Sequence, residues 1–109
     1  MANTFELKTK ANVGVTTVGI YTAPAATTTV VIGITLANTS GAGCNVGVGI
    51  TRAGAVEDIK LLKNAPVPQG SSLEFMAGNK VVLEATDTVT VDSDTNNSID
   101  AALTIMEIT

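Results

Sequence analysis

The stretch TTTVVIGITLAN, Thr27 to Asn38, decides the fold class of this chain. Its apolar side chains at Val30, Ile32, Ile34 and Leu36 share one parity. Alternation with a period of two predicts a strand that turns one face to a core. The many Thr, Val and Ile residues favour a pleated strand over a helix. We therefore predict a strand here, with those four side chains on one face.

The same alternation recurs along most of the chain, in NVGVGI, SLEF, KVVLEATDTVTVD and SIDAALTIMEIT. Segments rich in Gly, Pro, Asn and Asp separate these runs and are typical of turns. AVEDIKLLKNA fits both helical and strand spacing, and we favour a strand because the segment is short and lacks a helix cap. The sequence predicts an all-β fold, an antiparallel β-sandwich or jelly roll of about eight strands. We expect a single domain over residues 1–109, with residues 1–10 as a candidate N-terminal arm.

Composition excludes several classes of partner. The chain has 109 residues, of which 15% are charged, and carries ten acidic against six basic residues. No Lys or Arg follows Lys80, so the acidic C-terminal third would repel nucleic acid and anionic membranes. No apolar run approaches the ~20 residues of a membrane-spanning helix. The N-terminus lacks a signal-peptide pattern, and the single cysteine, Cys44, cannot form an intrachain disulfide, so we expect folding in a reducing cytoplasm.

The residues also argue against catalysis. The chain has no histidine, which is the commonest general base and transition-metal ligand. Cys44 has no imidazole to activate it, and GAGCNVGVG lacks the Lys-Ser/Thr of a phosphate loop. Only three aromatic residues are present, too few for a sugar platform. We expect neither an enzyme nor a cofactor or small-molecule substrate.

One stretch, DSDTNNSID, resembles a metal-binding loop. Oxygen-bearing side chains recur at every second position, at Asp92, Asp94, Asn96, Ser98 and Asp100. A helix–loop–helix calcium site would need flanking helices, a glycine at its sixth position and a bidentate glutamate at its twelfth, and none is present. We predict no metal and interpret DTNN as a hairpin turn, with a loop-borne calcium site on Asp92, Asp94, Asn96 and Asp100 as the weaker alternative.

Two places are candidates for contacts with another subunit or a capsid. Gly47 and Gly49 alternate with apolar residues, so another backbone could approach closely, within the chain's own sandwich or from a second subunit. Phe5 and Leu7 alternate with charged residues in the arm, Ala2 to Lys10. Such a strand could add to a neighbour's sheet edge or form the first strand of its own sandwich.

Two long segments resemble a known family. They are IYTAPAATTTVVIGITLANTSG, Ile20 to Gly41, and the stretch from Leu61 to the C-terminus, with its KNAPVPQGSSL and GNKVVLEATDTVTV blocks. About two-thirds of the chain is similar to small virion structural proteins of tailed bacteriophages, especially those of cyanobacteria and marine bacteria. The matching motifs are turn and core motifs, which indicate a fold more than a chemistry.

The resemblance implies a non-enzymatic capsid decoration, or cement, protein. Such a protein is expected as a homotrimer that binds the major capsid protein on the outer capsid surface, after assembly in the host bacterial cytoplasm. A tail, neck or fibre-base component and a host-surface adhesin are the alternatives.

Overall fold

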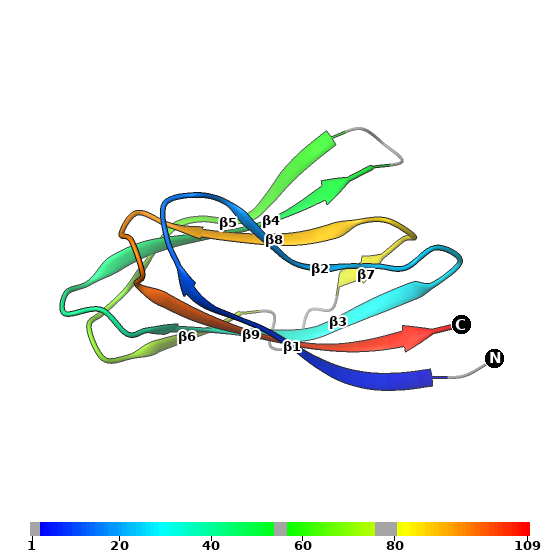
Figure 1. Cartoon of the computed structure of the whole chain (residues 1–109), viewed down its shortest axis with the longest axis horizontal. Helices are drawn as coiled ribbons and strands as arrows, with labels where there is room; N and C mark the ends of the chain where they lie inside the picture. Colours follow the sequence, from blue (N-terminus) through cyan, green and yellow to red (C-terminus); the bar gives the residue numbers. More distant parts are fainter. Residues whose placement is uncertain (1–2, 54–56, 76–80) are drawn as a thin grey trace.

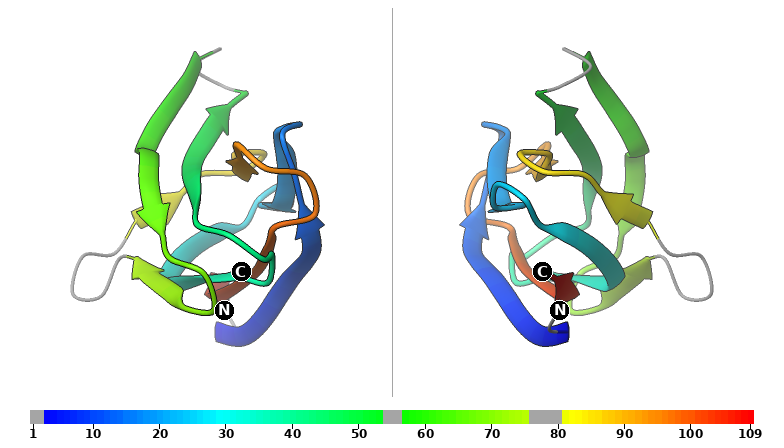
Figure 2. Two further views of the ribbon diagram at one scale, coloured as in Figure 1. Left: turned by 90° about the vertical axis from the view of Figure 1, so that its left-hand side faces the viewer. Right: turned by 90° about the vertical axis from the view of Figure 1, so that its right-hand side faces the viewer.

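The computed structural model describes residues 3–53, 57–75 and 81–109, and these form two antiparallel sheets packed face to face (Figures 1 and 2). The nine strands in these ranges are β1 (Asn3–Val13), β2 (Val18–Thr22), β3 (Thr28–Asn38), β4 (Cys44–Arg52), β5 (Glu57–Val67), β6 (Ser72–Phe75), β7 (Val81–Leu83), β8 (Thr88–Ser93) and β9 (Ile99–Ile108). Among the described residues, no helix is long and apolar enough to cross a bilayer.

The strand order is that of a jelly roll. The first sheet, called sheet A here, has the order β1-β9-β3-β6, and β7 also pairs with β3. The second, sheet B, has the order β2-β8-β4-β5. Strands β6 and β7 pair with successive parts of β3, so they share one strand position and leave two sheets of four positions each. The predicted all-β sandwich is therefore confirmed, and its topology is the double Greek key of a jelly roll.

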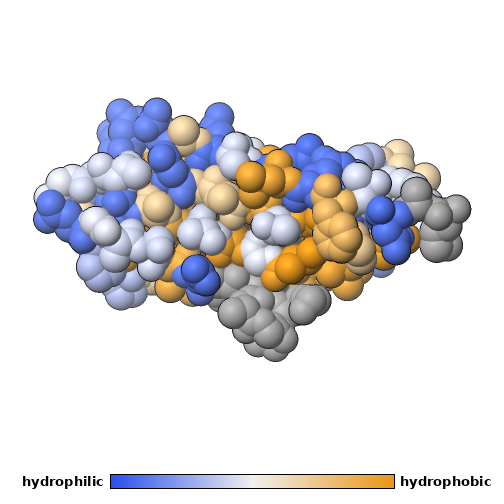
Figure 3. Space-filling view, turned by 90° about the horizontal axis from the view of Figure 1, so that it is seen from below, coloured by the Kyte–Doolittle hydropathy of each residue, from blue (hydrophilic) through white to orange (hydrophobic). Residues whose placement is uncertain are grey.

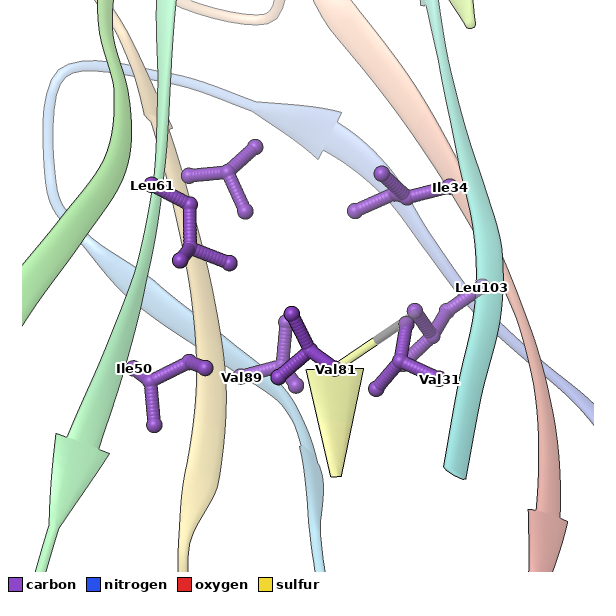
Figure 4. Close-up of a pocket in the computed structure, with 8 residues that line it drawn as sticks. Val31, Ile34, Ile50, Leu61, Val81, Val89 and Leu103 are labelled. Carbon is purple, nitrogen blue, oxygen red and sulfur yellow. The ribbon is translucent and has the colours of Figure 1, made fainter. Parts of the chain in front are cut away.

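The apolar core lies between the two sheets. Side chains from sheet A, including Leu36, Leu103 and Ile105, are almost fully buried against Val46, Val48 and Val91 from sheet B. Figure 4 shows side chains of both sheets pointing toward one another across a central cavity. That cavity measures about 10 Å³ and its lining is entirely apolar, so it can neither hold a ligand nor satisfy a water molecule.

The ambiguous segment before Pro66 is a strand, as predicted. It forms β5, which is an edge strand of sheet B, and Pro66 lies within it. An edge position suits proline because its missing N–H removes no hydrogen bond from the sheet interior.

The prediction for β3 is wrong in one respect. The pairing of β3 with β9 shifts register between Val31 and Gly33, so the face of each later residue is reversed relative to a regular strand. Val31 is buried with Ile34 and Leu36, while Val30 and Ile32 lie on the outer face. The bulge therefore moves two of the four predicted core residues to the surface.

The interpretation of DTNN as a hairpin turn is also wrong, because β8 and β9 belong to different sheets. The segment instead crosses from sheet B to sheet A. Ser98 holds the connection by bonding the Ser93 hydroxyl at 2.6 Å and the Thr95 carbonyl at 2.7 Å. Asn97 has a φ of 51°, a left-handed conformation that asparagine tolerates.

Candidate functional site

The outer face of sheet A carries a row of apolar side chains that no other part of the described chain covers. The strand registers align Phe5 of β1, Met106 of β9, Val30 of β3 and Val82 of β7 across the sheet. Phe5 is 69% exposed and Val82 is 58% exposed, and the neighbouring Leu7 is 64% exposed. Figure 3 views the molecule from this side and shows apolar surface gathered in one area. We call these five residues the apolar face.

The apolar face exists because, at this end of the sandwich, polar side chains face inward and apolar side chains face outward. In β1, Phe5 and Leu7 point outward, whereas Glu6 and Lys8 are opposite the inward-facing Ile105 and Leu103 of β9. The C-terminal end of β9 shows the same reversal, because Glu107 occupies the next inward-facing position after Ile105. A strand that packs polar side chains inward must present its apolar side chains to solvent.

The inward side chains form a polar bridge between the two sheets. The Tyr21 hydroxyl of β2 donates a hydrogen bond of 2.5 Å to Glu107 Oε2 and lies 2.8 Å from Thr29 Oγ1. Lys8 Nζ lies 2.8 Å from Glu6 Oε1 and 5.9 Å from the centroid of the Tyr21 ring. Charged and hydroxyl groups are thus satisfied by one another where the core would otherwise be apolar.

Contacts within the bridge shift the pKa values of Tyr21, Glu6 and Lys8. Burial, with the hydrogen bond to Glu107, raises the pKa of Tyr21 to about 12. The hydrogen bond from Lys8 lowers the pKa of Glu6, and the same contact raises the pKa of Lys8. Tyr21, Glu6 and Lys8 are thus each held in the protonation state that the group ordinarily has at neutral pH.

An open hollow adjoins the apolar face on the same side of sheet A. It has a volume of about 290 Å³ and is lined by Ile32, Gly33, Glu74, Ala102 and Thr104, among others. Among the described residues, its two chain neighbours aside, none has an atom within 4 Å of the place a Cβ would take at Gly33. The mixture of apolar, hydroxyl and carboxylate groups suits the rim of a protein contact.

The apolar surface also continues past Val82 into a second hollow between β5 and β7. This hollow measures about 430 Å³, and Ile59, which is 36% exposed, lines its far side. Arg52 borders it and forms ion pairs with Glu84 and with Asp87, the latter at 3.3 Å.

Of the predicted contact residues, Phe5 and Leu7 lie on the apolar face, whereas Gly47 and Gly49 lie elsewhere and are buried in sheet B. A Cβ at Gly47 would lie 2.5 Å from Asp92 Oδ1, and one at Gly49 would lie 2.7 Å from the Ile59 carbonyl oxygen. Neighbouring strands of the same sheet therefore account for the close approach at both glycines. No second subunit is needed to explain them.

The side chains of the calcium alternative are engaged with separate segments. Asp92 accepts a hydrogen bond from the Thr17 hydroxyl, Asp94 from the Asn45 N–H and Asp100 from the Asn12 N–H. Asn96 is exposed. Within the described ranges, no group of three or more Asp, Glu, Cys or His side chains is arranged to hold a metal ion.

Sequence reasoning missed Val30, Val82 and Met106 as members of the apolar face. The sequence did contain a signal near the C-terminus. Asp100 and Thr104 mark the outward-facing positions of the last strand, and Met106 and Ile108 continue the same positions with apolar side chains. Val30 gave no such signal, because only the bulge in β3 turns it outward.

Comparison with known proteins gives the fold and no family. No protein-family model matches the chain, and no curated protein does. Among solved structures, a chain of Bacillus endospore appendages, described as disulfide-linked pili, is similar with a TM-score of 0.56 and 18% identity, over 99% of this chain and 87% of that one.

A chain of the T13 viral particle of infectious bursal disease virus is similar with a TM-score of 0.58 and 12% identity, over 96% of this chain. A second structure of that virus, from the Gx strain, gives a TM-score of 0.58 and 14% identity over 98%. This chain spans only 30% and 32% of the two viral chains. At such low identity these similarities concern the jelly-roll fold alone.

Proposed function

We propose that this chain is a non-enzymatic structural protein of a virus particle, and specifically a capsid decoration or cement protein of a tailed bacteriophage. The observation that carries the proposal is the apolar face, a row of exposed and half-buried apolar side chains on the outer side of sheet A. Contiguous exposed apolar surface is unfavourable in water and is typical of protein contact sites. The jelly-roll fold, shared with a chain of a viral particle, supports the same role.

The partner of the apolar face is the major capsid protein at the outer capsid surface. A decoration protein gains its hold from many copies of a modest contact, each repeated by the symmetry of the shell. Burial of apolar surface contributes roughly 25 cal/mol per Å², so a face with three side chains more than half exposed supplies a useful part of each contact.

A point variant tests whether the apolar face is the contact. Val82→Lys places a charge in the face, so we expect capsids incubated with this variant to lose most of their decoration. Val15→Lys is the matched control, because Val15 is 57% exposed and lies in the connection between β1 and β2. Capsid occupancy after sedimentation is the measurement, and full occupancy by Val82→Lys would contradict the proposal.

Copy number in purified virions separates the proposed function from its alternatives. A cement protein is present on the order of hundreds of copies per particle, whereas a tail, neck or fibre-base component is present in tens or fewer. Gel densitometry against the major capsid protein measures the ratio. A host-surface adhesin is the third alternative, and it would bind host cells that lack virus, which labelled protein and flow cytometry can detect.

A disulfide-linked filament, as described for the endospore appendages, is not favoured. The lone Cys44 is only 5% exposed in β4, so it cannot reach a neighbouring subunit without opening the core.

A further inference from the structure

Strand β1 has an edge that pairs with nothing in the described chain. It bonds β9 on one side, in continuous register from Asn3 to Lys10, and its other side ends sheet A. The first irregularity follows Lys10, where the register shifts and Asn12 adopts a φ of 59°. The regular segment contains no proline or bulge, and its edge is protected against other strands by the charges of Glu6, Lys8 and Lys10 alone.

The charges of this segment complement themselves. If two copies of β1 pair as antiparallel strands about a two-fold axis, the axis runs perpendicular to the sheet and opposed residues face the same side. With Leu7 on the axis, Glu6 lies opposite the partner's Lys8, and Lys8 lies opposite the partner's Glu6. The register centred on Glu6 opposes two Glu6 carboxylates and forms no opposite-charge pair. The register centred on Lys8 places Glu6 opposite the partner's Lys10 but also opposes two Lys8 ammonium groups. Of these three registers, the one centred on Leu7 alone forms opposite-charge pairs without a like-charge pair.

We propose that β1 pairs with β1 of a second copy of this chain in the register centred on Leu7. The occupant of the free edge is thus a second copy, and the charge pattern is the reason. The Glu6 and Lys8 side chains are 30% and 38% exposed and already contact each other within one chain, so both can reach across the new strand boundary. Directly opposed side chains of paired strands have Cβ atoms about 5 Å apart.

This pairing joins the apolar faces of the two copies. Because the axis is perpendicular to the sheet, both outer faces of sheet A lie on the same side of the dimer. Phe5 and Leu7 of each copy meet near the axis, and the two faces become one surface across an extended sheet. The pairing does not depend on capsid binding, but under the proposed function it would double the surface offered to the shell.

A two-fold contact gives a dimer in solution, in place of the trimer that the resemblance implies. Sedimentation of the purified full chain at increasing concentration measures the state without virions, so failure here leaves the capsid proposal standing and failure of virion binding leaves the dimer standing. A strict monomer at high concentration, or a trimer, would overturn the pairing.

Charge reversal tests whether the β1 strands of two copies pair through these charges. Glu6→Lys alone, or Lys8→Glu alone, places like charges opposite one another at two positions, so we expect roughly tenfold weaker dimerisation for each variant. An equimolar mixture of the two variants restores opposite charges only between chains, since each chain has lost its own Glu6–Lys8 contact. We therefore expect the mixture to form heterodimers with near wild-type affinity. A mixture as weak as its components would rule out the pairing.

Matched controls and a cross-link complete the test. Glu57→Lys and Lys63→Glu change the same charges on β5, and both should dimerise like the wild type. Leu7→Cys should form a covalent dimer on mild oxidation, because residue 7 meets its own copy at the axis. Thr9→Cys should not, since the two residues lie roughly 13 Å apart along the strands. Cross-linking through position 9 and not 7 would assign a different register and contradict the proposal.

Discussion

Tyr21 forms a polar link between the two sheets. It is 7% exposed, and its hydroxyl joins β2 of sheet B to Thr29 and Glu107 of sheet A. A buried hydroxyl without hydrogen-bond partners would destabilise the fold. The two hydrogen bonds of the Tyr21 hydroxyl remove this cost and also connect the two sheets. Glu107 and Thr29 accordingly lie on the inward side of β9 and β3, where Ile105 and Val31 are the adjacent inward-facing residues.

Tyr21 gives a direct prediction about alkaline pH. An unfolded tyrosine ionises near pH 10, whereas the folded group has a pKa of about 12. The neutral phenol therefore stabilises the fold fully below pH 10, and this stabilisation is lost as the pH rises from 10 toward 12. Tyr21 is the only tyrosine and there is no tryptophan, so phenolate absorbance reports this group alone.

We expect the phenolate absorbance of the folded chain to rise with a midpoint near pH 12. Tyr21→Phe should lower the free energy of unfolding at neutral pH by about 1–2 kcal/mol, because two hydrogen bonds are lost. The same variant should also flatten the fall in stability above pH 10. A midpoint near pH 10 in the folded protein would show that the phenol is exposed.

At the scale of elements, strand β4 shows why glycine is required where a strand lies close to the strands on either side of it, here β8 and β5. Gly49 is crowded by the backbone of β5, which cannot move without breaking the pairing, and Gly47 is crowded mainly by the Asp92 side chain. In β3, by contrast, Gly33 lies beside a bulge with open space above it. Crowding by neighbouring strands thus explains the glycines at positions 47 and 49, whereas it does not apply at Gly33.

Alanine substitutions distinguish a crowded glycine from one with open space around it. Gly49→Ala places a Cβ 2.7 Å from the Ile59 carbonyl oxygen, so we expect a loss of about 1–3 kcal/mol in chemical denaturation. Gly33→Ala adds the same methyl group where no described residue other than its chain neighbours lies within 4 Å, so the free energy of unfolding should change by less than about 0.5 kcal/mol. Equal losses at both positions would mean that backbone conformation, and not crowding, sets the requirement.

At the scale of the whole molecule, one core holds the two sheets together and leaves the outer face of sheet A free for contacts. Leu103 is fully buried between the sheets, while Thr104, its neighbour in β9, lies on the outer face. Adjacent residues of one strand thus belong to the core and to the surface that borders the hollow.

Leu103→Ala and Thr104→Ala should therefore differ in their effect on the free energy of unfolding. The first leaves a cavity in the shared core, so we expect a loss of about 2–5 kcal/mol, measured by denaturant unfolding. The second removes little buried surface and should leave the free energy of unfolding within about 0.5 kcal/mol of the wild type. A small loss for Leu103→Ala would indicate that the two sheets are loosely packed.

The sequence by itself determined the all-β class and most strand positions, because a period of two and turn-forming residues are local properties of the chain. It also singled out Phe5 and Leu7 by their alternation with charges. Tertiary structure alone decided the outward turn of Val30, the crossing of residues 94–98 between sheets and the alignment of Val82 with Phe5. Each of these depends on which strands pair and in what register, and residues far apart in the chain settle that pairing.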